Sequence, residues 1–148
     1  MLEPLYRLIR YFEGLRLKRY LCPAGVWTIG YGSTGPDITA KTKPVTPEWA
    51  ETRMRADAQR FVREALRASP VLAAHPEKLC AIADFCYNLG SARYKASTLR
   101  RRINAERWEE AGDELLKWVW GGGRKLPGLV RRRIAERELL LGVDQADD

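Results

Sequence analysis

Apolar residues at helical spacing mark the first stretch of the chain as an amphipathic helix. Over residues 4–12 the apolar positions are Leu5, Leu8, Ile9 and Phe12, which fall on one face at 3.6 residues per turn. Pro4 suits the first helical position and Gly14 suits the position that stops a helix. The spacing therefore predicts a helix over residues 4–12 that ends beside Glu13.

A change from helical to alternating spacing predicts a β-hairpin next. Basic and apolar residues alternate over 16–20, and a β-rich run covers 26–32. Between them lies Cys22-Pro23-Ala24-Gly25, with proline second and glycine fourth, as in a type I turn. On the second strand, alternation separates a packing face from a face that leaves room for a bulky ligand close to the backbone. The first face holds Trp27, Ile29 and Tyr31, and the second holds Thr28, Gly30 and Gly32.

The rest of the chain reads as helices. Residues 33–46 are rich in Thr, Pro and Gly and predict an irregular loop or a third short strand. Thr46-Pro47 then signals the start of a long helix over 47–69. The next helix carries its apolar residues at i, i+3, i+4, i+7 and i+10 and stops at Gly90; they are Leu79, Ile82, Ala83, Cys86 and Leu89. Further helices are expected at 97–104, 106–119 and 128–141, with core positions for Trp108, Trp118 and Trp120 and a frayed polar tail at 144–148.

Composition narrows the classes of function. A chain of 148 residues predicts one domain. The 26 basic and 19 acidic residues give a net charge of +7, which predicts attraction to polyanions such as nucleic acid or a bacterial wall. The runs Arg100–Arg102 and Arg131–Arg133 spread around a helix, so we interpret them as solvated surface and expect no nucleic-acid partner. With His75 as the single histidine, no His-based metal site is available, and we predict no metal and no cofactor.

Two further features bear on location and redox chemistry. No run approaches the ~18 apolar residues of a membrane span, and the charges at Glu3, Arg7 and Arg10 leave no signal-peptide core. We therefore expect no stable membrane insertion.

Three cysteines are an odd count, and the spacing of Cys80 and Cys86 matches no zinc or redox motif. We interpret both as inert buried residues.

Three separated motifs together resemble a known family. Glu13, eight residues, Cys22, five residues and Thr28, followed by Ile29-Gly30-Tyr31-Gly32, form the first motif. The second is residues 84–90, DFCYNLG, with Ser97-Thr98-Leu99. The third runs from Trp118 through the glycines at 121–123 and LPGL at 126–129 to Glu136. In this order, over residues 5–141, the motifs resemble the phage-type lysozymes (endolysins) of glycoside hydrolase family 24, the T4-lysozyme-like group.

The resemblance implies an α+β fold and an enzyme. We expect a single lysozyme-like domain over 1–148, with a small β-hairpin lobe at 13–46, a linking helix at 47–69, and a helical lobe at 70–141 joined by the helix at 4–12. The substrate cleft would lie between the lobes. The implied activity is that of a monomeric muramidase cleaving the β-1,4 bond between N-acetylmuramic acid and N-acetylglucosamine in peptidoglycan. Such a protein accumulates in the host cytoplasm and needs a holin to reach the wall.

The resemblance also assigns catalytic roles to Glu13, Cys22 and Thr28. Glu13 would be the general acid, and its place at the negative end of a helix dipole suits a carboxyl that must carry a proton. Relatives with Asp at the second position use it to prepare the incoming water, which fits an inverting reaction. Cys22 leaves three options open: a thiolate base or nucleophile assisted by Arg16, Lys18 or Arg19, a weak stabiliser that leaves the water to Thr28, or an impaired enzyme that only binds the wall.

Other residues are candidates for substrate contact. The family places a polar residue at Asn88, and Gly30 and Tyr31 lie beside the catalytic threonine. Ser33 departs from the family, which often has histidine there. The rival classes are a peptidoglycan-binding protein without catalysis and a basic helical nucleic-acid-binding module.

Overall fold

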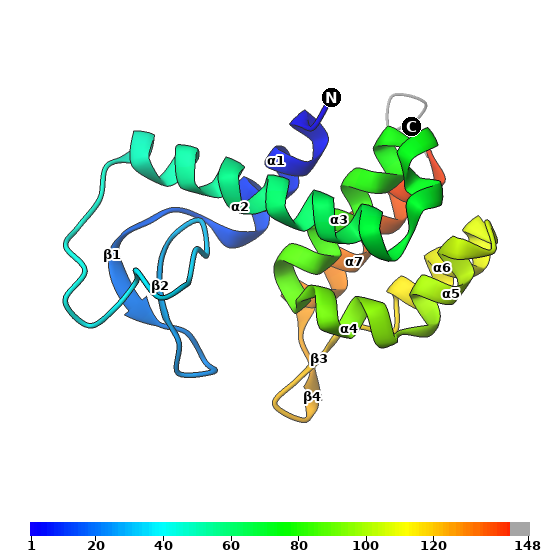
Figure 1. The fold of residues 1–148 in the computed structure, drawn as a ribbon. Coiled ribbons are helices and arrows are strands. Elements are labelled where there is room, and N and C mark those ends of the chain that lie inside the picture. Colours follow the sequence, from blue (N-terminus) through cyan, green and yellow to red (C-terminus); the bar gives the residue numbers. More distant parts are fainter. Residues whose placement is uncertain (143–148) are drawn as a thin grey trace, which may run out of the picture.

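Helices dominate the structure, a computed structural model that describes residues 1–142 (Figure 1). In chain order the elements are α1 (Glu3–Glu13), β1 (Arg16–Leu21), β2 (Trp27–Gly30), α2 (Pro47–Ala68), the 3-10 helix η1 (Pro70–Ala74), α3 (Pro76–Leu89), α4 (Ser91–Ala96), α5 (Thr98–Asn104), α6 (Trp108–Leu115), β3 (Trp120–Gly121), β4 (Arg124–Lys125) and α7 (Pro127–Leu141). The predicted α+β class is confirmed, with a β-hairpin on one side and a helical lobe on the other.

The first hairpin has the predicted turn but a different environment. The N–H of Gly25 donates to the carbonyl of Cys22 at 2.8 Å, which closes the four-residue turn. Tyr20 pairs with Thr28, but Arg16 pairs with Gly30, so the register shifts along β1. Thr28 and Ile29 are both buried. The second strand is therefore covered on both faces and has no open ligand face.

The residues that follow β2 form a loop. Within residues 33–46, Ile29 and Ser33 make an isolated bridge, and the N–H of Val45 donates to the carbonyl of Leu17 at 2.9 Å. The Arg53 guanidinium of α2 donates to the carbonyl of Thr34 at 2.6 Å. Of the two predictions for this segment, the irregular loop is confirmed.

Helix α2 spans the distance between the hairpin and the helical lobe (Figure 1). The Thr46 hydroxyl accepts a hydrogen bond from the N–H of Trp49 at 3.0 Å, and Pro47 occupies the first turn. This cap satisfies one of the N–H groups that a helix start leaves without a partner. The helix predicted from Thr46-Pro47 is present over Pro47–Ala68.

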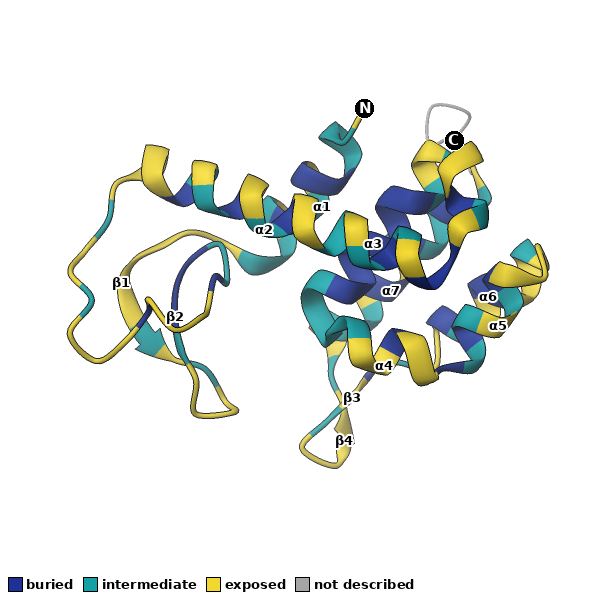
Figure 2. Ribbon diagram, in the orientation of Figure 1, coloured by how far each residue is buried: buried dark blue, intermediate teal, exposed yellow. Residues whose placement is uncertain are grey.

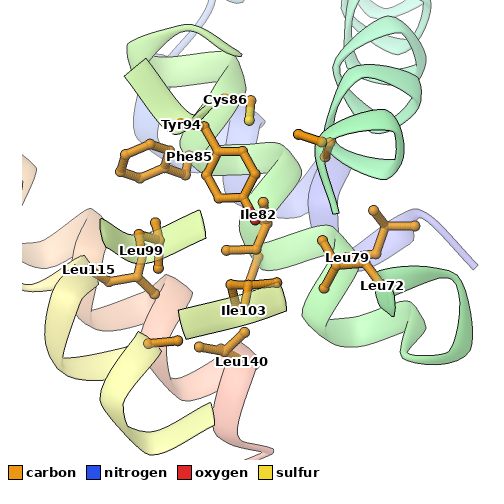
Figure 3. Packing of buried hydrophobic residues seen from close by; sticks show 14 residues of the cluster. Leu72, Leu79, Ile82, Phe85, Cys86, Tyr94, Leu99, Ile103, Leu115 and Leu140 are labelled. Carbon is orange, nitrogen blue, oxygen red and sulfur yellow. The ribbon is translucent and has the colours of Figure 1, made fainter. Parts of the chain in front are cut away.

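Helix α3 is the centre of the helical lobe. Its buried residues run without interruption from Leu79 to Cys86, and Figure 2 shows it among surrounding helices. The apolar residues predicted for this helix are buried or, for Leu89, half-buried against the core. Figure 3 shows Ile82 and Phe85 packed with side chains from α4, α5, α6 and α7; the labelled partners are Tyr94, Leu99, Ile103, Leu115 and Leu140.

A second buried cluster ties α1 to α2 and α3. It consists of Leu5, Tyr6, Ile9, Met54, Ala58, Cys80 and Ala83, with Tyr31 and Tyr87 packed at its edge. The apolar face predicted for the first helix is therefore packed against the helical lobe. This packing fixes the end of α1, and with it Glu13, relative to α3.

Four features of the C-terminal half differ from the prediction. The helix expected at 106–119 is shorter because Glu106 adopts a left-handed backbone (φ 57°), so α6 begins only at Trp108. The short helix α4 and the hairpin β3–β4 were not expected. Trp108 and Trp118 pack on the core as predicted, but Trp120, on the hairpin, is 65% exposed, so its predicted core position is wrong. The tail at 144–148 lies outside the described residues.

Replacing the cap of α2 should destabilise the protein measurably. Thr46→Ala removes the acceptor for the Trp49 N–H, and we expect it to lower the free energy of unfolding by about 1 kcal/mol. Urea unfolding followed by circular dichroism measures the change. Thr52→Ala, within the same helix and without a capping role, is the control; equal losses for the two variants would contradict the capping role of Thr46.

Candidate active site

Glu13 is the last residue of α1, as the sequence predicted. Its Oε2 accepts a hydrogen bond from Nη1 of Arg132 on α7 at 2.7 Å, and its side chain keeps 20% exposure. On the other side, a Cβ added to Gly32 would lie 2.5 Å from Oε1 of Glu13. Gly32, at φ +75°, thus lets the backbone after β2 pass directly against the acid. The glycine makes room for the Glu13 carboxyl, which differs from the ligand space predicted on that face.

Arg132 joins Glu13 to a buried carboxylate. Its Nε and Nη2 each donate to Asp84 of α3 at 2.8 Å, a two-point contact between fully buried groups. Burial alone would raise the pKa of Asp84, but the charge and hydrogen bonds of Arg132 outweigh it and hold that pKa below its usual range. Asp84 therefore remains a carboxylate and fixes the guanidinium that holds Glu13.

Glu136, one helical turn after Arg132, completes the buried network. Burial raises the pKa of Glu136 well above its usual range, even though the charge of Arg133 opposes this. A hydrogen bond between Glu136 and Asp84 acts on both groups, lowering the pKa of Asp84 and raising that of Glu136. This is the pattern of a protonated glutamic acid that donates to a carboxylate.

The neighbouring arginine, Arg133, holds the predicted substrate residue Asn88. Arg133 is fully buried, and its Nη2 donates to Oδ1 of Asn88 at 2.7 Å and to Glu136 at 3.0 Å. Because the amide oxygen is engaged, the Nδ2 group of Asn88 is the end left to donate. The prediction that the run Arg131–Arg133 is solvated surface is therefore wrong for Arg132 and Arg133 and holds for Arg131, which is exposed.

Glu13 and Asn88 open onto one hollow of about 600 Å³, which we call the Glu13 hollow. It lies between the end of α1, the end of α3 and the start of α7. It is lined by Tyr11, Phe12, Glu13, Asn88, Arg131, Arg132 and residues 126–129. The structure thus brings the predicted acid and the predicted substrate residue to the same concave surface.

Cys22 follows β1 at the start of the hairpin turn and is half-exposed. Hydrogen bonding from the backbone of Val26 is the largest influence that lowers the pKa of its thiol, against slight burial; the backbone of Ala24 and the Thr28 side chain act in the same direction. Two of the three predicted cationic helpers contact aromatic rings: Arg16 covers the Tyr20 ring at 4.2 Å, and Arg19 faces the Trp27 ring at 5.6 Å. The thiolate is favoured by hydrogen-bond donors and not by these arginines.

Thr28 and Tyr20 lie opposite each other on the two strands of the hairpin. Oγ1 of Thr28 donates to the carbonyl of Val26 at 2.9 Å, so its lone pairs remain available to accept. Burial raises the pKa of Tyr20, and the negative charges of Glu13 and Cys22 add to this, so the phenol lies within electrostatic range of both groups.

The other predicted contacts serve mainly to pack the hairpin. A Cβ at Gly30 would lie 3.3 Å from Cβ of Ala50, so this glycine makes room for α2. The Tyr31 side chain packs at the edge of the α1 cluster, and its carbonyl accepts from the Tyr87 hydroxyl at 2.6 Å. Ser33 donates to Asp57 at 2.8 Å, a hydrogen bond in place of the ion pair that histidine would make.

Among the described residues, no group of three or more His, Cys, Asp and Glu side chains is arranged to hold a metal ion. Nor does any helix in residues 1–142 have both the length and the apolar character needed to cross a membrane.

The sequence profile described as phage lysozyme matches residues 10–136, which includes every residue of this site. The chain belongs to the phage lysozyme family. The predicted family is confirmed, and with it the predicted class of enzyme, a lysozyme-type glycoside hydrolase.

Curated relatives agree with this assignment. The endolysin of Bacillus phage B103 is 38% identical over 136 residues, which cover 90% of this chain and 51% of that protein. This chain thus spans about half of the length of that endolysin. The endolysin of Acyrthosiphon pisum secondary endosymbiont phage 1 is 36% identical over 136 residues, covering 89% of this chain and 91% of that protein. The SAR-endolysin of Bacteriophage PS119 is 34% identical, with 87% and 76% covered.

Solved structures share the whole fold. The muramidase domain of SpmX from Asticaccaulis excentricus superposes with a TM-score of 0.81 at 31% identity, covering 94% of this chain and 95% of that one. The endolysin from Escherichia coli O157:H7 phage FAHEc1 gives a TM-score of 0.78 at 28% identity, with 94% and 91% covered. This phage lysozyme therefore has the lysozyme-like architecture expected from its motifs.

Sequence reasoning missed the residues that hold the acid. Arg132, Asp84 and Gly32 contact or support Glu13, yet each comes from a different part of the chain. One signal was present: Asp84 interrupts an otherwise apolar helix, and a carboxylate in such a position requires a buried partner. The spacing could not say which arginine would supply it.

Removing Arg132 should destabilise this phage lysozyme far more than removing its neighbour. Arg132→Gln leaves Asp84 buried without its cation, and we expect a loss of roughly 3–5 kcal/mol in the free energy of unfolding. Arg131→Gln removes the same charge from an exposed position and should stay within about 0.5 kcal/mol of the wild type. Denaturant unfolding compares the two variants, and similar losses would refute the buried role of Arg132.

The three cysteines should differ sharply in reactivity. Iodoacetamide should modify Cys22 first, with a rate-against-pH midpoint below that of free cysteine because the thiolate forms at lower pH. Cys80 and Cys86 are internal controls: burial raises the pKa of both thiols, that of Cys86 to about 12. Peptide mapping by mass spectrometry after brief labelling measures this, and faster labelling of either buried cysteine would contradict it.

Proposed function

We propose that this phage lysozyme hydrolyses the β-1,4 bond between N-acetylmuramic acid and N-acetylglucosamine in peptidoglycan, with Glu13 as the general acid. The observation that carries the proposal is the Glu13 carboxyl at the rim of a hollow, held on one oxygen by a buried arginine. The names of the relatives, which are endolysins and a muramidase domain, support the same substrate.

The geometry assigns the two oxygens of Glu13 different tasks. Oε2 is engaged by Arg132, so Oε1 carries the proton that is transferred to the bridging sugar oxygen. When the proton leaves, Glu13 becomes a carboxylate, and the guanidinium already in contact stabilises that charge. Arg132 thus positions the acid and favours the transfer, since it needs no rearrangement during the reaction.

Cys22 and Thr28 prepare the incoming water in this proposal. The role of Thr28 rests on its place in the family motif; its side chain is buried and its hydroxyl donates to the Val26 carbonyl. The lowered pKa of Cys22 supports the thiolate roles among the options: base toward that water, or nucleophile at the anomeric carbon. The two differ in outcome, because a base gives inversion and a nucleophile gives retention. Nuclear magnetic resonance of the first-formed anomer separates them.

Asn88 contributes substrate contact. With its oxygen held by Arg133, its amide N–H₂ can donate to an acceptor in the Glu13 hollow, and the acetamido carbonyls of both sugars are such acceptors. Gly30 and Tyr31 are left out of this proposal, since the space at Gly30, the Tyr31 ring and the Tyr31 carbonyl are used in packing and hydrogen bonding within the protein.

Three predictions from the sequence belong to this proposal. The protein accumulates in the host cytoplasm, it reaches the wall through a membrane lesion made by a holin, and it is a monomer. Expression in bacteria with and without a co-expressed holin tests the second. The nucleic-acid alternative loses its main support, because two of the three arginines in the run 131–133 are buried. No observation favours the non-catalytic wall binder.

The acid is the decisive position to test. Glu13→Gln keeps the shape and the contact with Arg132 but cannot deliver a proton, so we expect clearing of cell-wall suspensions to fall by at least about 10³-fold. Cys22→Asp should remain active, because a carboxylate can prepare the water, and should escape inhibition by iodoacetamide. Turbidity assays on purified walls measure both variants. Full activity of Glu13→Gln would end the proposal.

A further inference from the structure

A hollow of about 360 Å³ lies between the end of α2, helix α4 and the start of α5. We call it the α4 pocket. It is lined by Glu64, Arg67, Ala68, Ser91, Lys95 and Arg100. The Glu13 hollow ends at Asn88 on α3, whereas the α4 pocket begins at Ser91, the first residue of α4. The two hollows share no residue, so the α4 pocket is separate from the proposed active site.

Three cations from three helices converge on the α4 pocket. Arg67 belongs to the last turn of α2, Lys95 to α4 and Arg100 to α5. None of the three forms an ion pair with a carboxylate of residues 1–142. The carboxylate in the lining is Glu64, which lies 3.6 Å from Arg60 outside the pocket. Even with Glu64 counted in full, the three cations leave an excess of two positive charges in the lining.

The Arg100 side chain is held in place by backbone carbonyls. Its Nε donates to the carbonyl of Ala68 at 2.9 Å, and its Nη1 donates to the carbonyl of Lys95 at 3.2 Å. The Ala68 carbonyl also accepts from Nδ2 of Asn104 at 3.2 Å, so the negative end of α2 is already occupied by donors. Arg100 is half-buried, and neutral carbonyls leave its positive charge uncompensated. An anion in the α4 pocket would supply the missing counter-charge.

We propose that the α4 pocket binds a phosphate group, either the free ion or the terminal phosphate of a small organic molecule. A phosphate monoester carries a charge of about −1.5 to −2 at pH 7 and has three acceptor oxygens. These properties match the excess of two positive charges and the three cationic side chains. A carboxylate has one charge and two oxygens, so it would leave a cation without a partner.

The size of the α4 pocket limits what the phosphate can be attached to. Its volume of about 360 Å³ is near the lower end of the ~300–1,000 Å³ that is usual for small-molecule sites. It therefore has room for a phosphate with a small substituent. Because no residue of the Glu13 hollow takes part, this binding depends neither on Glu13 nor on hydrolysis.

A titration followed by nuclear magnetic resonance tests the site. At about 0.15 M ionic strength, where attraction between distant surface charges is screened, inorganic phosphate should shift the amide signals of residues 91–100. We expect saturable binding with a dissociation constant of about 1 mM or lower, and binding of acetate at least about fivefold weaker. Absence of saturable phosphate binding, or acetate that binds as tightly as phosphate, would overturn the proposal.

Variants with matched controls locate the binding in the α4 pocket. Arg67→Gln and Lys95→Gln each remove one cation and should weaken phosphate binding at least about fivefold. Arg63→Gln and Arg93→Gln remove exposed arginines from the same two helices outside the pocket and should stay within about twofold of the wild type. All four side chains are exposed, and thermal unfolding verifies that the variants are folded. Equal weakening by the control variants would show general attraction to a basic protein and would overturn the site.

The choice of ligand identifies the source of the phosphate. Glycerol 3-phosphate that binds more tightly than inorganic phosphate would support an organic phosphate ester, and the reverse order would support the free ion. Dimethyl phosphate, a diester with a single charge, should bind at least about fivefold more weakly than either; equal binding would contradict the match to a doubly charged group. Glu13→Gln should bind phosphate as the wild type does, so failure of the catalytic proposal would leave this result unchanged.

Discussion

The contact between Arg132 and its two carboxylates is the constraint on which the site depends. A guanidinium that is almost fully buried is costly unless its hydrogen-bonding capacity is used, and here Asp84 takes two donors and Glu13 a third. Because Asp84 belongs to the central helix α3 and Arg132 to α7, the packing of these two helices determines where the acid lies. Glu13 is positioned by the core of the helical lobe as much as by its own helix.

Two consecutive arginines on α7 each hold one polar side chain that lines the Glu13 hollow. Arg132 holds the acid, and Arg133 holds the amide of Asn88. Neighbouring residues on a helix point about 100° apart, so one turn of α7 can reach the end of α1 and the end of α3 together. Glu136 contacts Arg133, and burial raises the pKa of Glu136 well above its usual range.

The β-hairpin and the residues after it approach the rest of the molecule at glycines. Gly32 lets the chain approach Glu13 and Gly30 lets it approach α2, so the strand is pinned between the acid and the linking helix. Hydrogen bonding from the turn after β1, above all from the backbone of Val26, lowers the pKa of the Cys22 thiol.

The chain by itself determined the local structure and the family. Periodicity and turn residues located α1, α2, α3 and the hairpin, and the spacing of Glu13, Cys22 and Thr28 identified the family, because these signals are carried by residues close together in sequence. Tertiary structure decided the partners. The packing of the elements decides whether an arginine at 131, 132 or 133 faces solvent or a buried aspartate. It also decides whether a glycine faces a ligand or a helix. The exposed Trp120 and the buried Arg132 were both predicted wrongly for that reason. A hydrophobic residue favours burial and a charged residue favours solvent. Whether Trp120 is buried or Arg132 is exposed, however, depends on how distant segments of the chain pack.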